Sequence, residues 1–191
     1  MAGFVMSTVT VRFVFPAVSA EGAAFWIIRT APISLRDFLW SKFWTGLVPV
    51  LLLSECLTIA GNELLGVDPF LKRVAAVTIV FMAFALVGLA TGLGARYPRF
   101  AADNPSQIAG SYGGVAFMIL AVLFIIVMIV LLGWPSSIYL FAKFRERALT
   151  NGEQLSIAAM FTTAAIVSIA TFLLGMRTGV RALDEMDRTP S

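Results

Sequence analysis

The reactive residues that this chain lacks restrict its chemistry first. It contains no histidine, so no imidazole can act as a general base or as a metal ligand. The single cysteine, Cys56, has no second thiol in the chain for a disulfide or a thiolate metal site. None of the lysines follows a glycine, so the phosphate-binding loop G-x-x-x-x-G-K-[ST] is absent. We therefore expect no cofactor, no metal and no enzymatic activity in this chain, with any nucleotide hydrolysis occurring on another polypeptide.

One ionisable side chain, that of Glu55, lies in the middle of a long apolar run. A charged carboxylate at the centre of a membrane helix costs about 3 kcal/mol on insertion scales. Ser54, Thr58 and Asn62 lie at helical spacing on the same side, so these four residues form an intramembrane polar stripe. Two interpretations remain open, because Glu55 either lines a transport route or is a protonated packing residue. In both, we expect Glu55 to face the protein interior.

The composition and the apolar runs show what kind of element carries these residues. Of 191 residues, 59% are hydrophobic and only 13% are charged, about half the charged share of a soluble domain. Four apolar runs exceed 20 residues, enough to cross a hydrocarbon core of about 30 Å. We therefore predict an all-α, polytopic helical membrane protein with four full transmembrane helices. The four runs are Trp44 to Gly66, Val74 to Gly94, Tyr112 to Gly133 and Leu155 to Met176.

The basic residues indicate how the chain is oriented. With the N-terminal segment, the loop around Arg99 and the C-terminal tail on one side, nine of the 14 basic residues share that side. The positive-inside rule then places both termini in the cytoplasm. The net charge of +3 includes no basic run, so we expect membrane lipid and not nucleic acid as a partner. The nine are Arg12, Arg29, Arg36, Lys42, Arg96, Arg99, Arg177, Arg181 and Arg188.

The N-terminal segment is too short to cross a bilayer. Met1 to Val11 would reach only about 16 Å as a helix. We expect the natural gene product to be longer at this end, so that residues 1–18 form a truncated span; the alternative is a short interfacial anchor. The predicted single transmembrane domain, residues 1–191, then continues with two short helices in 19–43, four spans in 44–176 and a cytoplasmic tail in 177–191.

The two short helices of residues 19–43 are predicted from their caps. Ser19 caps a first helix that ends before Pro32, and Ser34 opens a second, with Asp37 in the capping-box position. The second helix is expected to lie along the headgroups and to lead into the first complete span. On these features alone, both helices could also be interfacial anchors without a partner.

Pairs of glycines separated by four residues predict close helix approach. For each pair, packing inside the chain is favoured over dimerisation. The pairs are Gly88 with Gly92, Gly110 with Gly114, and Gly175 with Gly179.

The run APISLRDFLWSKFW resembles a segment of type-2 ABC exporter permeases. In that segment a Pro-[Ile/Val]-Ser triplet precedes a polar turn and a lysine shortly before a membrane span. Glu21-Gly22 resembles the acidic-glycine element found upstream of it. The longer run RFVFPAVSAEGAAFWIIRTAP, with LGARYPRFAADNP later, is similar to a subgroup of large bacterial permeases, and the resemblance extends from Arg12 to about Leu132.

The resemblance implies the C-terminal portion of a permease subunit of a type-2 ABC exporter in the bacterial inner membrane. Such a subunit has six spans, forms a dimer of permease halves and is coupled to a separate ATPase subunit through a cytoplasmic helix. Pro32, Ser34 and Lys42 would follow that coupling helix. The alternative function is a non-transporting membrane scaffold or assembly factor, while an intramembrane enzyme is disfavoured because no paired carboxylates or nucleophile–base set occurs. The residues implied to contact the ATPase are Glu21, Gly22, Phe25, Trp26 and Arg29.

Overall fold

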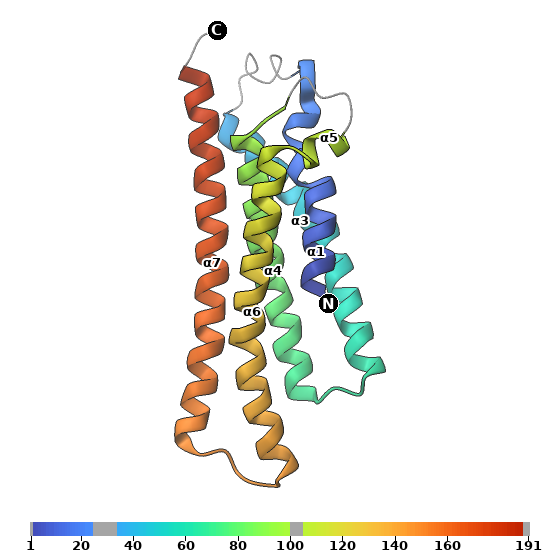
Figure 1. Cartoon of the computed structure of the whole chain (residues 1–191), viewed down its shortest axis with the longest axis vertical. Helices are drawn as coiled ribbons and strands as arrows, with labels where there is room; N and C mark the ends of the chain where they lie inside the picture. Colours follow the sequence, from blue (N-terminus) through green and yellow to red (C-terminus); the bar gives the residue numbers. More distant parts are fainter. Residues whose placement is uncertain (1, 25–33, 100–104, 189–191) are drawn as a thin grey trace.

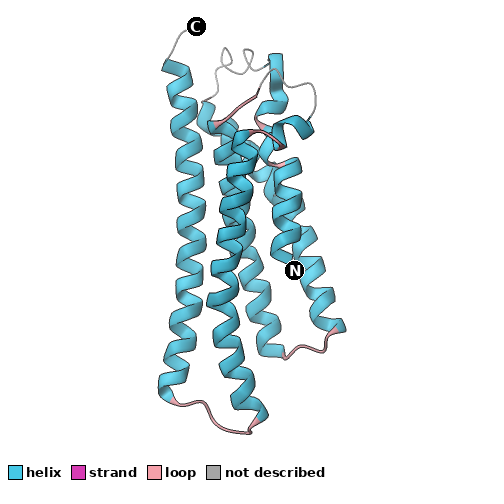
Figure 2. Ribbon diagram, in the orientation of Figure 1, coloured by secondary structure: helices cyan, strands magenta, loops and turns pink. Residues whose placement is uncertain are grey.

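Long helices that run side by side make up most of the computed structural model of this chain (Figure 1). The structure describes residues 2–24, 34–99 and 105–188, and within these ranges it contains helices and loops but no strand (Figure 2). The all-α prediction is therefore confirmed. The helices are α1 (Ala2–Phe13), the 3-10 helices η1 (Phe15–Ala17) and η2 (Ser19–Ala24), α3 (Leu35–Leu64), α4 (Pro69–Arg96), α5 (Pro105–Ala109), α6 (Tyr112–Phe144) and α7 (Asn151–Arg188).

Five helical segments of the described chain are long and apolar enough to cross a membrane. Four of them, in α3, α4, α6 and α7, correspond to the four predicted apolar runs. The fifth, Ala2–Gly22, joins α1 to the two 3-10 helices and includes the segment that the sequence predicts to be a truncated span or an anchor. The polytopic helical architecture is thus present, with one more candidate span than the sequence predicts.

The second predicted interfacial helix and the first predicted span form one continuous helix, α3. Ser34 caps it as predicted, since its hydroxyl oxygen accepts the backbone N–H of Asp37 at 3.0 Å. Pro49 lies inside the helix without ending it. The reason for the continuity is an unbroken buried stripe at helical spacing, which runs from the predicted interfacial helix into the span. Its members are Leu35, Phe38, Leu39, Phe43, Leu47, Val50 and Ser54.

The helices α6 and α7 are also longer than their predicted spans. The sequence predicts a loop from Trp134 to Gln154, whereas α6 continues through Pro135 to Phe144 and only residues 145–150 connect it to α7. Pro135 removes one backbone N–H, but the last turns of α6 are held by Tyr139 and Lys143, which both bind Asp68. Likewise, most of the predicted C-terminal tail belongs to α7.

The closest helix contact in the described chain joins the backbones of α4 and α7. A methyl group in place of a hydrogen of Gly92 would lie 1.8 Å from the carbonyl oxygen of Gly175, and one on Gly179 would lie 2.8 Å from the Cα of Gly92. At Gly88 it would lie 2.6 Å from the ring of Phe172. Two of the predicted glycine pairs therefore face each other across one seam, the α4–α7 seam, and they allow the helices to touch at backbone distance.

An aromatic cluster attaches α3 to this seam. The rings of Phe43 on α3, Phe84 on α4 and Phe172 on α7 lie with centroids 5.3 to 6.0 Å apart. Phe43 is fully buried and Trp40 packs edge-on against it at 5.6 Å. Ring pairs at such distances add about 0.5–1.5 kcal/mol beyond the area they bury. The cluster thus fixes the position of the N-terminal half of α3 against the two packed helices.

We predict that replacing Gly92 with Ala destabilises the folded protein by about 1–3 kcal/mol, because the added methyl group overlaps the Gly175 carbonyl and must push α7 away. Gly61→Ala is the matched control, since Gly61 is also in a long helix and a methyl group there meets nothing within 4 Å. Thermal unfolding in detergent, followed by circular dichroism, measures both variants. If Gly92→Ala is as stable as Gly61→Ala, the backbone contact between α4 and α7 is contradicted.

At the opposite end of the bundle, Asp68 joins the α3–α4 turn to α6. Its carboxylate caps α4 by accepting the Phe70 N–H at 2.9 Å. It also accepts the Tyr139 hydroxyl at 3.1 Å and pairs with the Lys143 ammonium group. The rings of Phe70 and Tyr139 stack beside it, with centroids 4.7 Å apart. The hydrogen bond from Lys143 holds the pKa of Asp68 below its ordinary value of 3.8, with further lowering from the Phe70 N–H and Tyr139.

Because the pKa of Asp68 is lowered by folding, its carboxylate stabilises the fold fully above the ordinary value of 3.8. That stabilisation is lost as the pH falls through the lower pKa of the folded state. We predict that the thermal stability of Asp68→Asn depends less on pH than that of the wild type when both are measured between neutral pH and pH ~2. Glu146→Gln, which changes an exposed carboxylate at the same end, is the control. If the thermal stability of Asp68→Asn falls with decreasing pH as steeply as that of the wild type, this account is contradicted.

Candidate functional site

The first group of predicted site residues lies in η2, at the end of the bundle where α1 ends and α3 begins (Figure 1). The carboxylate of Glu21 forms an ion pair with the ammonium group of Lys42 on α3, and both side chains are about three-quarters buried or slightly less. Gly22 follows with a φ of +49°, a conformation that residues with a side chain rarely adopt. The acidic-glycine element therefore closes a sharp turn that is fastened to α3.

Ser19 has a partner that the sequence does not predict. The sequence predicts that it caps a helix reaching to Thr30, of which residues 25–30 lie outside the described residues, and in the structure its hydroxyl oxygen accepts the backbone N–H of Arg99 at 3.0 Å. The bond spans 80 positions of the sequence and ties η2 to the segment that follows α4. This long-range partner cannot be read from local spacing. Ser19 and the Glu21–Lys42 ion pair together hold η2 between two helices.

The other residues of the implied ATPase contact, Phe25, Trp26 and Arg29, lie outside the described residues, as does Pro32. The structure therefore brings Glu21 and Gly22 to Lys42. The role of the five residues in contacting an ATPase stays a prediction.

The second group is the intramembrane polar stripe on α3, and its members have separate environments. Ser54 is buried and its hydroxyl donates to the carbonyl of Val50 at 2.7 Å. Thr58 and Asn62, one and two turns further on, line a cavity of about 440 Å³. The Thr58 hydroxyl oxygen is buried there, with no hydrogen-bond partner in the part of the chain that the structure describes. Glu55 is partly buried and does not belong to the walls of this cavity, and its orientation toward the protein interior stays a prediction.

The cavity beside Thr58 is bounded by four helices and is mostly apolar. Ala2 and Phe4 of α1 close one side, and Ile79, Met82, Ile125 and Ile129 of α4 and α6 form much of the rest. Its lining contains hydroxyl and amide groups but no charged side chain. It can hold an apolar molecule with a hydrogen-bonding group, and it offers no acid–base pair for catalysis.

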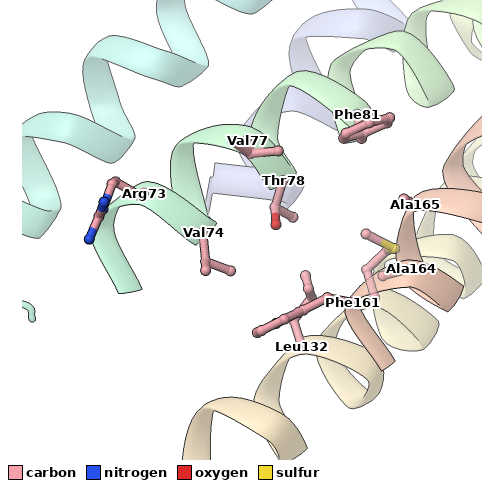
Figure 3. A pocket seen from close by; sticks show the side chains of 10 residues that line it. Arg73, Val74, Val77, Thr78, Phe81, Leu132, Phe161, Ala164 and Ala165 are labelled. Atoms are coloured by element: carbon pink, nitrogen blue, oxygen red, sulfur yellow. The ribbon is translucent and has the colours of Figure 1, made fainter. Parts of the chain in front are cut away.

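A second cavity, of about 270 Å³, lies on the other side of the α4–α6 contact (Figure 3). Figure 3 shows Thr78 of α4 directed toward Leu132 and Phe161, while Arg73 extends away from them at the rim. Thr78 lines both cavities. The sequence reasoning missed it, because a single threonine in an apolar run acquires significance only once the helices around it are placed.

Within residues 2–24, 34–99 and 105–188, no group of three or more carboxylate or thiol side chains is arranged to hold a metal ion. The fold and these sites define an all-α protein with several helices able to cross a membrane and with apolar cavities between them. A family profile described as "Putative ATP-binding cassette" matches residues 1–188. The chain therefore belongs to this ATP-binding cassette family. Neither the curated proteins nor the solved structures contain a match to it.

The family match corrects the identification made from the sequence. The matching family is described as an ATP-binding cassette and not as a permease, so the assignment to a permease subunit of a type-2 ABC exporter is wrong. The exporter function coupled through a cytoplasmic helix falls with it, and the scaffold or assembly-factor alternative is not supported either. The physical reason is that apolar spans and short polar interfacial segments are required of any polytopic helical protein, so they do not distinguish one family from another.

The Glu21–Lys42 ion pair generates a test of how η2 is held. We predict that Glu21→Gln or Lys42→Met alone lowers stability by about 1 kcal/mol, because each leaves a partly buried charge or polar group without its partner. The exchange Glu21→Lys with Lys42→Glu should recover part of this loss. Unfolding in detergent measures all variants. A double exchange that is no more stable than the summed effects of Glu21→Lys and Lys42→Glu alone would contradict the pairing.

Proposed function

We propose that this chain is a membrane-embedded helical component of an ATP-binding cassette transporter, and that ATP is bound and hydrolysed on a separate polypeptide. The observation that carries the proposal is that the chain matches an ATP-binding cassette family but lacks the phosphate-binding motif. The chain belongs to an ATP-binding cassette family over residues 1–188, yet its 191 residues contain no glycine followed by lysine. The family's ATP chemistry then needs a partner.

The chemistry of phosphate binding supports this division. ATP-binding cassettes hold the nucleotide phosphates in a loop between a strand and a helix, where backbone N–H groups and a lysine surround the anions. The described part of this chain contains helices and loops but no strand, so it offers no such loop. Its two apolar cavities are lined by apolar side chains with a few hydroxyl and amide groups, and only Arg73, at the rim of one of them, carries a charge, so they favour apolar groups over a triphosphate.

The charge distribution supports a position for the partner. The end of the bundle with η2, the end of α4 and the end of α7 carries the larger share of the basic residues, which favours the cytoplasmic side, where ATP is available. We therefore place this end of the bundle, with the last turns of α7, in the cytoplasm of a bacterial cell, with the multi-pass helices in its membrane and an ATPase subunit at that end. Glu21 and Gly22 lie in η2 at the same end.

We predict that photolabelling with an azido analogue of ATP marks a P-loop polypeptide that copurifies with this chain, and leaves the chain itself unlabelled. The experiment uses membranes in which the tagged chain is expressed with the ATPase gene of its genomic neighbourhood. Excess unlabelled ATP is the control for specific labelling. Label on the chain that ATP removes would contradict the proposal, and so would an active complex without any P-loop polypeptide.

A further inference from the structure

A pocket of about 550 Å³ lies between the end of α4 and the last turns of α7, away from the two apolar cavities. Its character is different, because charged and hydroxyl-bearing side chains form a large part of the wall. The lining side chains are those of Arg96, Tyr97, Thr178, Arg181, Glu185 and Met186, with Ala182.

Two arginines from different helices meet in this pocket. Arg96 is the last residue of α4, and its guanidinium lies 5.8 Å from the centre of the Tyr97 ring. Arg181 comes from α7 and is exposed. In the described ranges, neither arginine forms an ion pair with a carboxylate, although Glu185 belongs to the same wall. With Glu185 counted, the pocket keeps a net positive charge of one.

The depth of the pocket matches the headgroup layer of a bilayer. The apolar runs of α4 and α7 end at Gly94 and Met176, so Arg96 and Arg181 follow two and five residues later. At about 1.5 Å per residue, the two guanidinium groups belong to backbone about 3 and 8 Å beyond the hydrocarbon edge. Each headgroup layer is about 5–8 Å thick, which is where lipid phosphates lie.

Helix-end electrostatics accounts for only one of the two arginines. A cation at a helix C-terminus offsets the partial negative charge of the last carbonyl groups, and this suits Arg96. Arg181 lies seven residues before the end of α7, outside the last turn. The two arginines line the same pocket, where a single anion could contact both.

We propose that this pocket binds the phosphate group of an anionic phospholipid. Guanidinium groups bind phosphate oxygens through paired N–H donors, and basic pockets between membrane helices at the interface are suited to lipid headgroups. The inference requires that the helices span a membrane, but it does not depend on where ATP is hydrolysed. Its failure and the failure of the proposed function are therefore distinguishable.

The test is native mass spectrometry of the full chain released from nanodiscs that contain phosphatidylglycerol and phosphatidylcholine in equal amounts. The wild type should retain phosphatidylglycerol in preference. Arg96→Gln and Arg181→Gln should each reduce that preference about fivefold, since one arginine near the surface contributes about 1 kcal/mol. Arg177→Gln is the matched control, because it removes the same charge from the same helix one turn away and outside the pocket lining. It should behave like the wild type.

Three results would overturn the proposal. Equal retention of the two lipids would show that no anionic headgroup is preferred, and an equal loss in Arg177→Gln would show that only the general surface charge matters. Displacement of the retained lipid by millimolar inorganic phosphate would indicate a site for a free anion. If a glutamine variant loses the thermal transition of the wild type, Arg96→Lys and Arg181→Lys replace it. These keep the charge, and the proposal predicts a partial loss because the paired donors are gone.

Discussion

The backbone contact between α4 and α7 is the constraint on which the rest of this bundle depends. In a bilayer, helices gain little from hiding apolar side chains from one another, because lipid tails are equally apolar. Association then depends on how closely the helices pack, and here the carbonyl of Gly175 occupies the space where any other residue at position 92 would have its side chain. Once α4 and α7 are in contact, Phe172 meets Phe84 and Phe43, and this positions α3.

Polar interactions in this protein concentrate at the two ends of the bundle. Asp68 joins α4 to α6 at one end, and at the other Glu21 pairs with Lys42 while Ser19 binds the chain after α4. Apart from Glu55 and Asn62, the part between the ends is apolar, with hydroxyl groups largely bonded to carbonyls of their own helix, as for Ser54, Thr91 and Ser168. This division suits a bilayer, where charge is tolerated at the interface and costly inside. It also leaves the two apolar cavities without a group able to bind a nucleotide.

Apolar length made the spans predictable, and glycine spacing indicated close helix approach, since both are local properties of the sequence. That the helix with Gly88 and Gly92 packs on the helix with Gly175 and Gly179 could not be read from it. The length of α6 was not predictable, because α6 continues past its apolar run on the strength of a distant partner, Asp68, which binds Tyr139 and Lys143. Helical periodicity placed Ser54, Thr58 and Asn62 of the polar stripe on one side of the helix. Only the packing of the neighbouring helices shows that Ser54 bonds to a carbonyl of its own helix, whereas Thr58 and Asn62 line a cavity. The family assignment failed because short interfacial motifs carry little that is specific to one family, whereas the match over residues 1–188 uses the whole chain.

The seam is tested most directly by cysteine crosslinking in native membranes. In a Cys56→Ser background, cysteines are placed at positions 88 and 172, because a Cβ at Gly88 would lie 3.4 Å from the Cα of Phe172, within the reach of a disulfide, so a mild oxidant should join α4 to α7. A matched pair at positions 77 and 173, two exposed sites of the same helices about two turns apart in depth, should not react. Efficient crosslinking of the first pair alone is the result that this account predicts. Absence of that crosslink in folded, membrane-inserted protein would contradict the packing of α4 on α7 and the bundle built around it.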